Sequence, residues 1–343
     1  MIGGKRRGIF GVHGRLRRMI CGALAAALLA AACVAEPELR PENIRATAEY
    51  LCNEIGCRPA GSAAERSACD HLALQLEALG FSQADGTLLR SAFDGLQGMR
   101  SENLTAVCNG GRDELPLVSI VAHYDSVATS PGARDNAAAV GILLELARVL
   151  GREAALPCEI RMVFLGSEEN GYHGAKAYVQ SLTDQDRARH IAAFNMDISA
   201  ASPSDAAEPV IFILGGHLPD GRYADAEFLP ACTNSVADAA AQAWAAAHGE
   251  RPRIFVYGES DHVRFHEAEL EAVNLCMRRL EDGLPRLPES YHQMHDLPEE
   301  LDCDAAAQLG ACILDAIALL CAPAEVDGTE SRSGTWFSFN PDL

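Results

Sequence analysis

The chain has 343 residues, of which 48% are hydrophobic and 22% are charged, so it can bury a sizeable core in one large domain or two small ones. Its 28 Lys and Arg residues are outnumbered by 48 Asp and Glu residues, which gives a formal net charge of −20 at pH 7. Nucleic-acid-binding proteins normally carry a basic surface, so this balance excludes nucleic acid as the expected partner.

Residues 1–35 differ in composition from the rest of the chain. Basic residues precede an Ala- and Leu-rich stretch from about Met19 to Ala32, and no acidic residue occurs before Glu36. This order is typical of a secretory signal peptide; the alternative is a membrane anchor, although the apolar stretch is short for a full span. The run LLAAAC, ending at Cys33, also resembles a bacterial lipoprotein cleavage site whose leucine is one place too far upstream. We expect a secreted or cell-surface protein, attached to a membrane only through lipid on Cys33 or an uncleaved anchor.

Hydrophobic patterns predict that helices and strands alternate along the next part of the chain. Helical patterns cover 41–56, 63–79, 135–150, 171–190, 232–247, 260–267 and 299–321. Apolar runs of strand length occur near 103–108 and at 115–123, 159–166, 191–197, 209–216, 253–258 and 270–277. Such strands are buried on both faces. The pattern therefore predicts one α/β domain over 36–325, with a central, mostly parallel mixed sheet between helices, followed by a loosely attached tail at 326–343.

The 12 cysteines are many for an exported chain, yet none forms a C-x-x-C pair, so zinc-finger and thioredoxin motifs are not supported. Cys52 and Cys57 are close enough in sequence to close a small disulfide loop. Cys303, Cys312 and Cys321 fall in a helical pattern and are expected to be buried as small apolar residues.

Acidic residues and a histidine follow several of the predicted strands. These residues are His123, Asp125, Asp135, Glu168, Glu169 and Asp197, and the later loop SYHQMHD adds Tyr291, His292, His295 and Asp296. Taken singly, each has a structural explanation, such as an N-cap or a surface residue. Together they should lie at one rim, because ligands bind beyond the carboxyl ends of the strands in open α/β sheets. Several buried carboxylates need cations to stay ionised, and mixed His and carboxylate ligands suit catalytic zinc, so a metal pair is predicted.

Six separated segments carry a family resemblance: AHYDS, GARDNAAAV, GSEENGYHGA, FNMD, ESDHVRF and YHQMHD. In their order and spacing the chain resembles, over roughly residues 42–322, the secreted zinc aminopeptidases with a co-catalytic metal pair, whose relatives include the glutaminyl cyclases. The resemblance implies a zinc-exopeptidase-like α/β fold, two Zn²⁺ ions per chain and peptide substrates with a free N-terminus.

The resemblance also implies which residues bind the metals. His123 and Asp197 would bind one zinc ion, Glu169 and His292 the other, and Asp135 would bridge the two. In the family the peptide bond that follows this bridging residue is often cis.

Four further residues receive roles from the same resemblance. Glu168 would be the general base, and Tyr291 would donate a hydrogen bond to the developing oxyanion. Asp125 would accept the second ring N–H of His123. Asp261 would support the site from behind the metal ligands.

The implied activity is the release of N-terminal amino acids by hydrolysis. Glutaminyl cyclisation with one zinc ion on the same scaffold is the nearest alternative, and a non-catalytic binding relative is another. The loop departs from the family pattern at Gln293, where relatives commonly have Thr, and at His295, which we expect to be solvent-exposed. Arg58 and Ser62 match an R-x-x-G-S turn, for which a role in the helix-to-helix turn is expected.

Overall fold

The computed structural model describes residues 38–322 except 152, 154–155, 203–206 and 214–233. The expected signal segment at 1–35, the tail at 326–343 and the end of the predicted strand at 209–216 lie outside the described residues. All the described elements belong to one unit that begins near Leu39.

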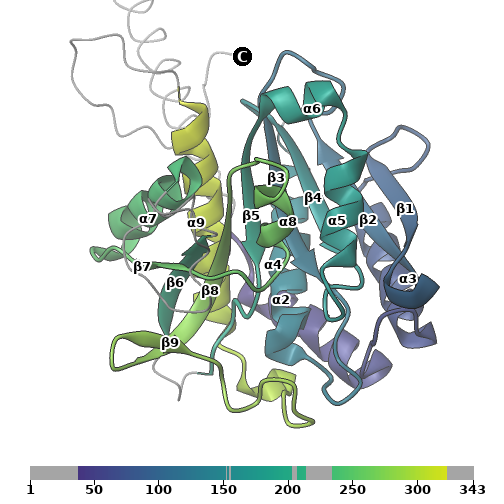
Figure 1. Cartoon of the computed structure of the whole chain (residues 1–343), viewed down its shortest axis with the longest axis vertical. Helices are drawn as coiled ribbons and strands as arrows, with labels where there is room; N and C mark the ends of the chain where they lie inside the picture. The colour runs from purple at the N-terminus through teal and green to yellow at the C-terminus, as the bar shows by residue number, and fades with distance from the viewer. Residues whose placement is uncertain (1–37, 152, 154–155, 203–206, 214–233, 323–343) are drawn as a thin grey trace, which may run out of the picture. The chain divides into compact units, whose positions relative to one another are not determined.

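The described strands form one mixed sheet in the order β1-β2-β4-β3-β5-β8-β6-β7, with β9 paired to β8 (Figure 1). They are β1 Leu88–Asp94, β2 Arg100–Cys108, β3 Leu117–His123, β4 Glu159–Leu165, β5 His190–Met196, β6 Glu208–Ile213, β7 Arg253–Val256, β8 Ala272–Glu281 and β9 Leu284–Arg286. The central strands β4, β3, β5 and β8 run parallel, whereas β1, β2, β6 and β9 each pair antiparallel to a neighbour. The predicted α/β fold with a mixed sheet is confirmed.

Two strands were not predicted, β1 and β9. In β1 only the first residue, Leu88, is buried, and β9 has three residues. A strand with so few buried side chains has no apolar run or alternation by which its sequence could be distinguished from a loop.

The strand register brings three chain segments to the same edge of the sheet. His123 at the end of β3 lies opposite Leu165 of β4, and Val121 of β3 lies opposite Asn195 of β5. The chain therefore leaves all three strands at one level, shortly before Asp125, Glu168 and Asp197. The position of the candidate site follows directly from this register.

Helices cover both faces of the sheet (Figure 1). They are α2 Pro41–Glu49, which continues as a π-helical turn to Ile55, α3 Ala63–Ala78, α4 Ala138–Leu150, α5 His173–Ser181, α6 Asp184–Arg189, α7 Ser235–His248, α8 His262–His266 and α9 Cys303–Cys321. Successive residues of β3 alternate between two cores: Ile120 packs with α2, α4 and α9, and Val121 packs with α5 and α8. Alternation along a strand thus explains why each central strand is apolar throughout.

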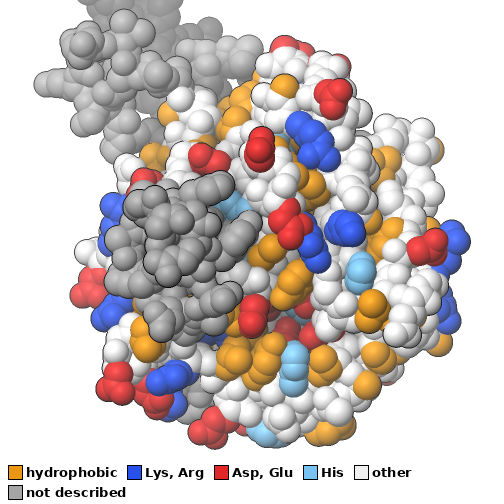
Figure 2. Space-filling model, in the orientation of Figure 1, with side chains coloured by type: hydrophobic (Ala, Val, Ile, Leu, Met, Phe, Trp, Pro, Cys, Tyr) orange, Lys and Arg blue, Asp and Glu red, His pale blue; other side chains and the backbone are white. Residues whose placement is uncertain are grey.

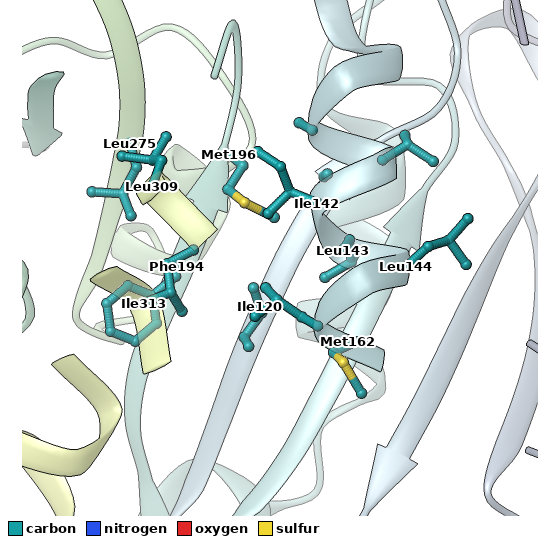
Figure 3. Packing of buried hydrophobic residues seen from close by; sticks show 14 of the residues in the cluster. Ile120, Ile142, Leu143, Leu144, Met162, Phe194, Met196, Leu275, Leu309 and Ile313 are labelled. Carbon is teal, nitrogen blue, oxygen red and sulfur yellow. The ribbon is translucent and has the colours of Figure 1, made fainter. Parts of the chain in front are cut away.

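The larger core lies between the sheet, α4 and α9. Figure 3 shows Ile142 and Leu143 of α4 and Ile313 of α9 facing Ile120 and Phe194 of the sheet. Among the described helices, α9 alone is long and apolar enough to cross a membrane by composition, but it packs against α2, α4 and α7 and is therefore a core helix.

Arg58 is completely buried and joins the end of the π-helical turn to the connection between β3 and α4. Its guanidinium donates hydrogen bonds to the backbone oxygens of Tyr124 (2.8 Å), Pro131 (2.6 Å), Gly56 (2.9 Å), Leu51 (3.1 Å) and Gly132 (3.4 Å). The expected role in a helix-to-helix turn was too narrow, because these carbonyls belong to the segments after β3 and before Asp135 as well. Ser62 behaves as expected and caps α3 by accepting the N–H of Glu65.

Cys52 and Cys57, whose spacing would allow a small disulfide loop, are both free thiols in this structure. The π-helical turn directs Cys52 inward, where its thiol donates to the backbone oxygen of Pro131 at 3.3 Å. Cys303 and Cys312 are buried as expected, and Cys321 is partly buried.

Candidate metal centre

The structure brings the five predicted metal ligands together. One carboxylate oxygen of Asp135 lies 3.3 Å from Nε2 of His123, and the other lies 3.3 Å from Nε2 of His292. Oδ1 of Asp197 lies 3.7 Å from the same atom of His123, and Oε2 of Glu169 lies 3.1 Å from that of His292. Asp135 therefore lies between two sets of ligands, His123 with Asp197 and His292 with Glu169, and one of its oxygens faces each set.

The donor set fits divalent metal ions. Among the described residues, several buried polar atoms of the cluster have no hydrogen-bond partner, namely Nε2 of His123, Oε1 of Glu169, Oδ1 of Asp197 and Nε2 of His292. Buried polar atoms without a partner are costly, so native proteins rarely keep them unless an ion or water satisfies them. Ligand atoms within 4.8 Å of one another form two overlapping triads, His123–Asp135–Glu169 and His123–Glu168–Asp197. Imidazole nitrogens with carboxylate oxygens and no thiolate are the donors of a catalytic zinc site.

Asp125 fixes the two adjacent glutamates by their backbone. Its Oδ1 accepts the N–H of Glu168 at 3.0 Å, and its Oδ2 accepts the N–H of Glu169 at 3.2 Å. Nδ1 of His123 lies 3.2 Å from the backbone oxygen of Asp125 and 3.5 Å from its Oδ1. Asp125 thus faces the second ring nitrogen, as the resemblance implied, but the nearer acceptor is its carbonyl. The carboxylate mainly sets the direction in which the two glutamate side chains leave β4.

The acidic side chains perturb one another strongly. Burial raises the pKa of Glu168 well above its usual range; the charges of Asp261 and Asp197 raise it further, and nearby His123 opposes them. Burial likewise raises the pKa of Glu169 to about 7. Burial alone would also raise the pKa of Asp135, but the neighbouring imidazoles of His123 and His292 outweigh burial and lower it. So many carboxylates in one buried cluster need added positive charge to be ionised together.

Asp135 lies in an irregular turn, Ala133–Ala137, just before α4, and the Asp135–Asn136 peptide bond is cis, as the resemblance implied. Gly132 precedes this turn with φ +64°, and a Cβ there would lie 2.1 Å from the backbone oxygen of Asp135. Only glycine therefore fits at this position. Asn136 donates from Nδ2 to the backbone oxygen of Met196 at 2.8 Å, which joins the turn to the end of β5.

Tyr291 and His292 stack on one another, with ring centroids 3.7 Å apart and planes 20° from parallel. Burial and the charges of Asp135 and Asp197 raise the pKa of Tyr291, so its phenol keeps its proton and remains a hydrogen-bond donor. His295 is solvent-exposed, as expected.

Asp261 lies behind the cluster at the start of α8 and is completely buried. Burial raises its pKa to about 8, and the charges of Asp125 and Asp197 act in the same direction. Its supporting role remains a prediction, because neither carboxylate oxygen has a hydrogen-bond partner in the described part of the chain.

Two acids position parts of the site in ways that the sequence did not indicate, Asp296 and Glu65. The carboxylate of Asp296 accepts the backbone N–H groups of Arg134 (3.1 Å) and Asp135 (3.3 Å). Glu65 is buried in the first turn of α3 and accepts from Ser167 N (3.1 Å), Ser101 Oγ (2.6 Å) and Gly61 N (2.6 Å). An acid in the first turn of a helix is ordinary, so nothing in the sequence singled out Glu65. Asp296 was noticed only as part of its loop.

The site opens to solvent on one face. Figure 2 shows carboxylate groups in a hollow framed by hydrophobic side chains and histidines. A cavity of about 260 Å³ is lined by residues that include Arg134, Ile198 and Ser290, the chain neighbours of Asp135, Asp197 and Tyr291, but none of the predicted metal ligands lines it.

Known proteins resemble this chain in sequence and in fold. A model of Peptidase family M28 matches residues 103–317. The chain is 29% identical over 239 residues to aminopeptidase YwaD of Bacillus subtilis (strain 168), which is 68% of this chain and 47% of that protein. The chain therefore spans about half the length of this curated relative.

Solved structures share the fold at low identity. BSAP, a zinc aminopeptidase from Bacillus subtilis, has a TM-score of 0.68 at 20% identity, covering 82% of this chain and 95% of that one. Bacteroides thetaiotaomicron glutaminyl cyclase has a TM-score of 0.63 at 15% identity, covering 82% and 98%. At such identities the likeness shows the fold alone, and an aminopeptidase and a cyclase share it.

Proposed function

The chain belongs to peptidase family M28, and from that premise we propose that it is a zinc-dependent aminopeptidase that releases N-terminal amino acids from peptides. The observation that carries the proposal is the position of Asp135, whose two oxygens face His123 and His292 separately. That arrangement suits two zinc ions, one held by His123 and Asp197 and the other by Glu169 and His292, with Asp135 shared.

Zinc ions bound by these residues would polarise the substrate carbonyl and lower the pKa of water. Glu168 acts as the general base: its carboxylate takes a proton from the attacking water and returns it to the leaving amine. Its backbone N–H, anchored on Asp125, holds it beside Glu169. Tyr291 keeps its proton and donates a hydrogen bond to the oxyanion that forms.

The surplus of carboxylates favours a substrate with a free α-ammonium group. Two zinc ions would bring four positive charges to a cluster of six carboxylates, those of Asp125, Asp135, Glu168, Glu169, Asp197 and Asp261. The remaining negative charge attracts an ammonium group, which would restrict the enzyme to the first residue of a peptide. Export to the cell surface or beyond, proposed from the basic-then-apolar order of residues 1–35, would place peptides within its reach.

Glutaminyl cyclisation is the second candidate, because a glutaminyl cyclase shares the fold. That reaction joins a substrate's own amine to its side chain and needs no water as nucleophile. The pair Glu168 and Glu169, held by one carboxylate, instead supplies both a ligand and a base, which favours hydrolysis.

The test is turnover of aminoacyl-anilides by the purified protein, before and after chelation and after zinc is restored. We expect hydrolysis that disappears with chelation and returns with about two zinc ions per chain. N-acetylated substrates are the matched control and should not react. Conversion of N-terminal glutaminyl peptides to a cyclic product, with one zinc ion and no anilide hydrolysis, would establish the second candidate instead.

A further inference from the structure

A buried arginine lies near the end of β8, at the edge of the sheet that carries the candidate metal centre. Arg278 exposes only 5% of its surface, and its Nη1 has no hydrogen-bond partner among the described residues. A buried guanidinium without an acceptor is costly, because the charge has left water and gained no counter-charge in exchange. Arg278 therefore calls for either a structural explanation or an anion that binds to it.

The strand register places Arg278 on the same face of the sheet as two of the predicted metal ligands. Ala193 of β5 lies opposite Ala272 of β8, and both pack in the core that includes α5 and α8. His123 comes two residues after Val121 of β3, which packs in the same core. Side chains alternate along a strand, so every second residue returns to one face. Counting on by twos places on this face Asn195 and Asp197 after Ala193, and Asn274, Cys276 and Arg278 after Ala272.

Arg278 also lies close to the ligands along the chain direction. Asp197 N donates to the backbone oxygen of Leu275 at 3.4 Å, and Met277 N donates to that of Ile198 at 2.9 Å. The chain after β5 thus follows β8, and Arg278 is two residues further along than the level of Asp197. At about 4.8 Å between strands and 3.3 Å per residue, the Cα atoms of Asp197 and Arg278 are roughly 8 Å apart. A carboxylate on a substrate held at the metal centre is therefore within reach of the guanidinium.

The surroundings of Arg278 do not supply the missing acceptor. Its guanidinium carbon lies 5.9 Å from the centre of the Phe212 ring, which packs against the ring of Tyr257 with 4.9 Å between centroids. Glu208 is paired directly opposite Arg278 across β6 and β8, but it is exposed, and in the described chain the two form no ion pair. An aromatic face attracts a cation but does not replace a carboxylate as the acceptor for Nη1.

A buried cation here is an exception to the charge of the molecule. The chain carries a formal net charge of −20, and the neighbouring metal centre is a cluster of carboxylates. The carboxylates attract an ammonium group, whereas Arg278 attracts a negative group a short distance away. A substrate that carries both groups close together would satisfy both parts of the site.

We propose that Arg278 selects peptide substrates that carry a carboxylate close to the free N-terminus, and that this carboxylate is the acceptor for its guanidinium. The inference rests on the proposed aminopeptidase function and names the class of its substrates. Two sources offer the same group: the side chain of an N-terminal aspartate or glutamate, and the C-terminus of a dipeptide. Arginine binds either one through charge-assisted hydrogen bonds.

The experiment compares substrates that differ only in the carboxylate. Aspartyl- and glutamyl-anilides, against their asparaginyl and glutaminyl counterparts, test the side chain. Alanyl-alanine, against its C-terminal amide, tests the chain end. We expect kcat/KM to be at least about 10-fold higher for the acid in one of these comparisons, the effect of a hydrogen bond to a charged group. The comparison that responds identifies the source.

Arg278→Met keeps a long side chain and removes the charge, so the acid-to-amide ratio of kcat/KM should fall toward one. The midpoint of urea unfolding should be no lower than in wild type, because an apolar group replaces an unpaired buried charge. A purely structural arginine would give the reverse, a lower midpoint with an unchanged ratio. Arg279→Met is the matched control: its side chain is 51% exposed on the other face of the strand, pairs with Glu281 at 2.9 Å, and should keep the wild-type ratio.

Equal kcat/KM for acid and amide in every wild-type comparison, or an unchanged ratio in Arg278→Met, would overturn the proposal. If none of the substrates is hydrolysed, the proposed peptidase function has failed, and calorimetric titration of aspartate against asparagine, and of alanyl-alanine against its amide, takes the place of turnover. Tighter binding of the acid that is lost in Arg278→Met then supports the carboxylate site on its own, and equal binding of acid and amide refutes it.

Discussion

The carboxylate of Asp296 accepts the backbone N–H of Asp135 at 3.3 Å across 161 positions of sequence. Asp135 is the residue whose oxygens face both halves of the candidate metal centre, and Asp296 follows His292 in the same loop. One hydrogen bond thus joins the loop that supplies one ligand to the turn that supplies the shared ligand. The two segments are positioned as one unit.

Asp296→Ala should therefore weaken metal binding without removing a ligand. The backbone N–H groups of Arg134 and Asp135 would lose their acceptor, and support of this kind is typically worth about 10- to 100-fold in metal affinity. Zinc titration with a competing chelator measures the effect. Glu299→Ala, at an exposed position three residues along, is the control and should bind zinc like wild type. A zinc affinity of Asp296→Ala equal to that of wild type would contradict the positioning role of Asp296.

Glu168→Gln should keep the metal content and lose activity. The amide preserves the shape of the side chain, and the anchoring bond from Glu168 N to Asp125 belongs to the backbone. Since general-base catalysis contributes about 10²- to 10⁴-fold, turnover should fall by at least the lower figure. Metal analysis and kcat are measured on the same preparation. Wild-type turnover in this variant contradicts the assignment of the base.

His292→Ala should separate the two metal positions. It removes the ring nitrogen beside Glu169 and Asp135 and leaves the group around His123 complete. We expect about one zinc ion to be retained after dialysis where wild type retains two. His295→Ala, in the same loop and solvent-exposed, is the matched control. Two ions in both variants would exclude His292 as a ligand.

The candidate site could be predicted from the sequence to the extent that its residues follow strands. His123, Glu168, Glu169 and Asp197 come after apolar runs, and parallel strands bring their ends together, so their meeting was predictable. Arg58 and Glu65 were not, because a buried arginine and a buried first-turn glutamate look like ordinary turn and helix residues until their distant partners are known.

The fold could be predicted where strands are buried on both faces, and the prediction missed strands with few buried side chains. Central strands are recognisable in the sequence as continuous apolar runs because both of their faces are buried. In β1 only Leu88 is buried, and the strand is held by its backbone pairing with β2. Backbone pairing is independent of side-chain type and leaves little trace in the sequence.

Arg58→Lys should destabilise the protein even though the charge is kept. The planar guanidinium donates to five carbonyl oxygens in two chain segments, whereas an ammonium group has three donors on a flexible stem. Carbonyls left without a donor in a fully buried position cost about 1 to 3 kcal/mol each. We expect the free energy of unfolding to fall by about 2 kcal/mol or more in a urea titration. Arg66→Lys, on the exposed side of α3, should change it little.

Glu65 should make stability depend on pH. Burial raises its pKa to about 7 in the folded chain from 4.5 when unperturbed, while hydrogen bonds from Ser101, Gly61 and Ser167 oppose that rise. Between these values the folded state holds a proton that the unfolded state has lost. The stability contributed by this group is therefore fully present below pH 4.5 and is lost as the pH rises through about 7.

Glu65→Gln removes that titration, so the difference in unfolding free energy between wild type and variant is the quantity to follow. As the pH rises from 5.5 to 8, the unfolding free energy of wild type should fall relative to that of Glu65→Gln. Urea unfolding of metal-free protein at matched ionic strength measures both values. Glu77→Gln, at an exposed position near the end of the same helix, is the control and should show no such shift. A constant difference across the pH range for Glu65→Gln would mean that Glu65 stays ionised in the folded chain, held by its three donors despite its burial.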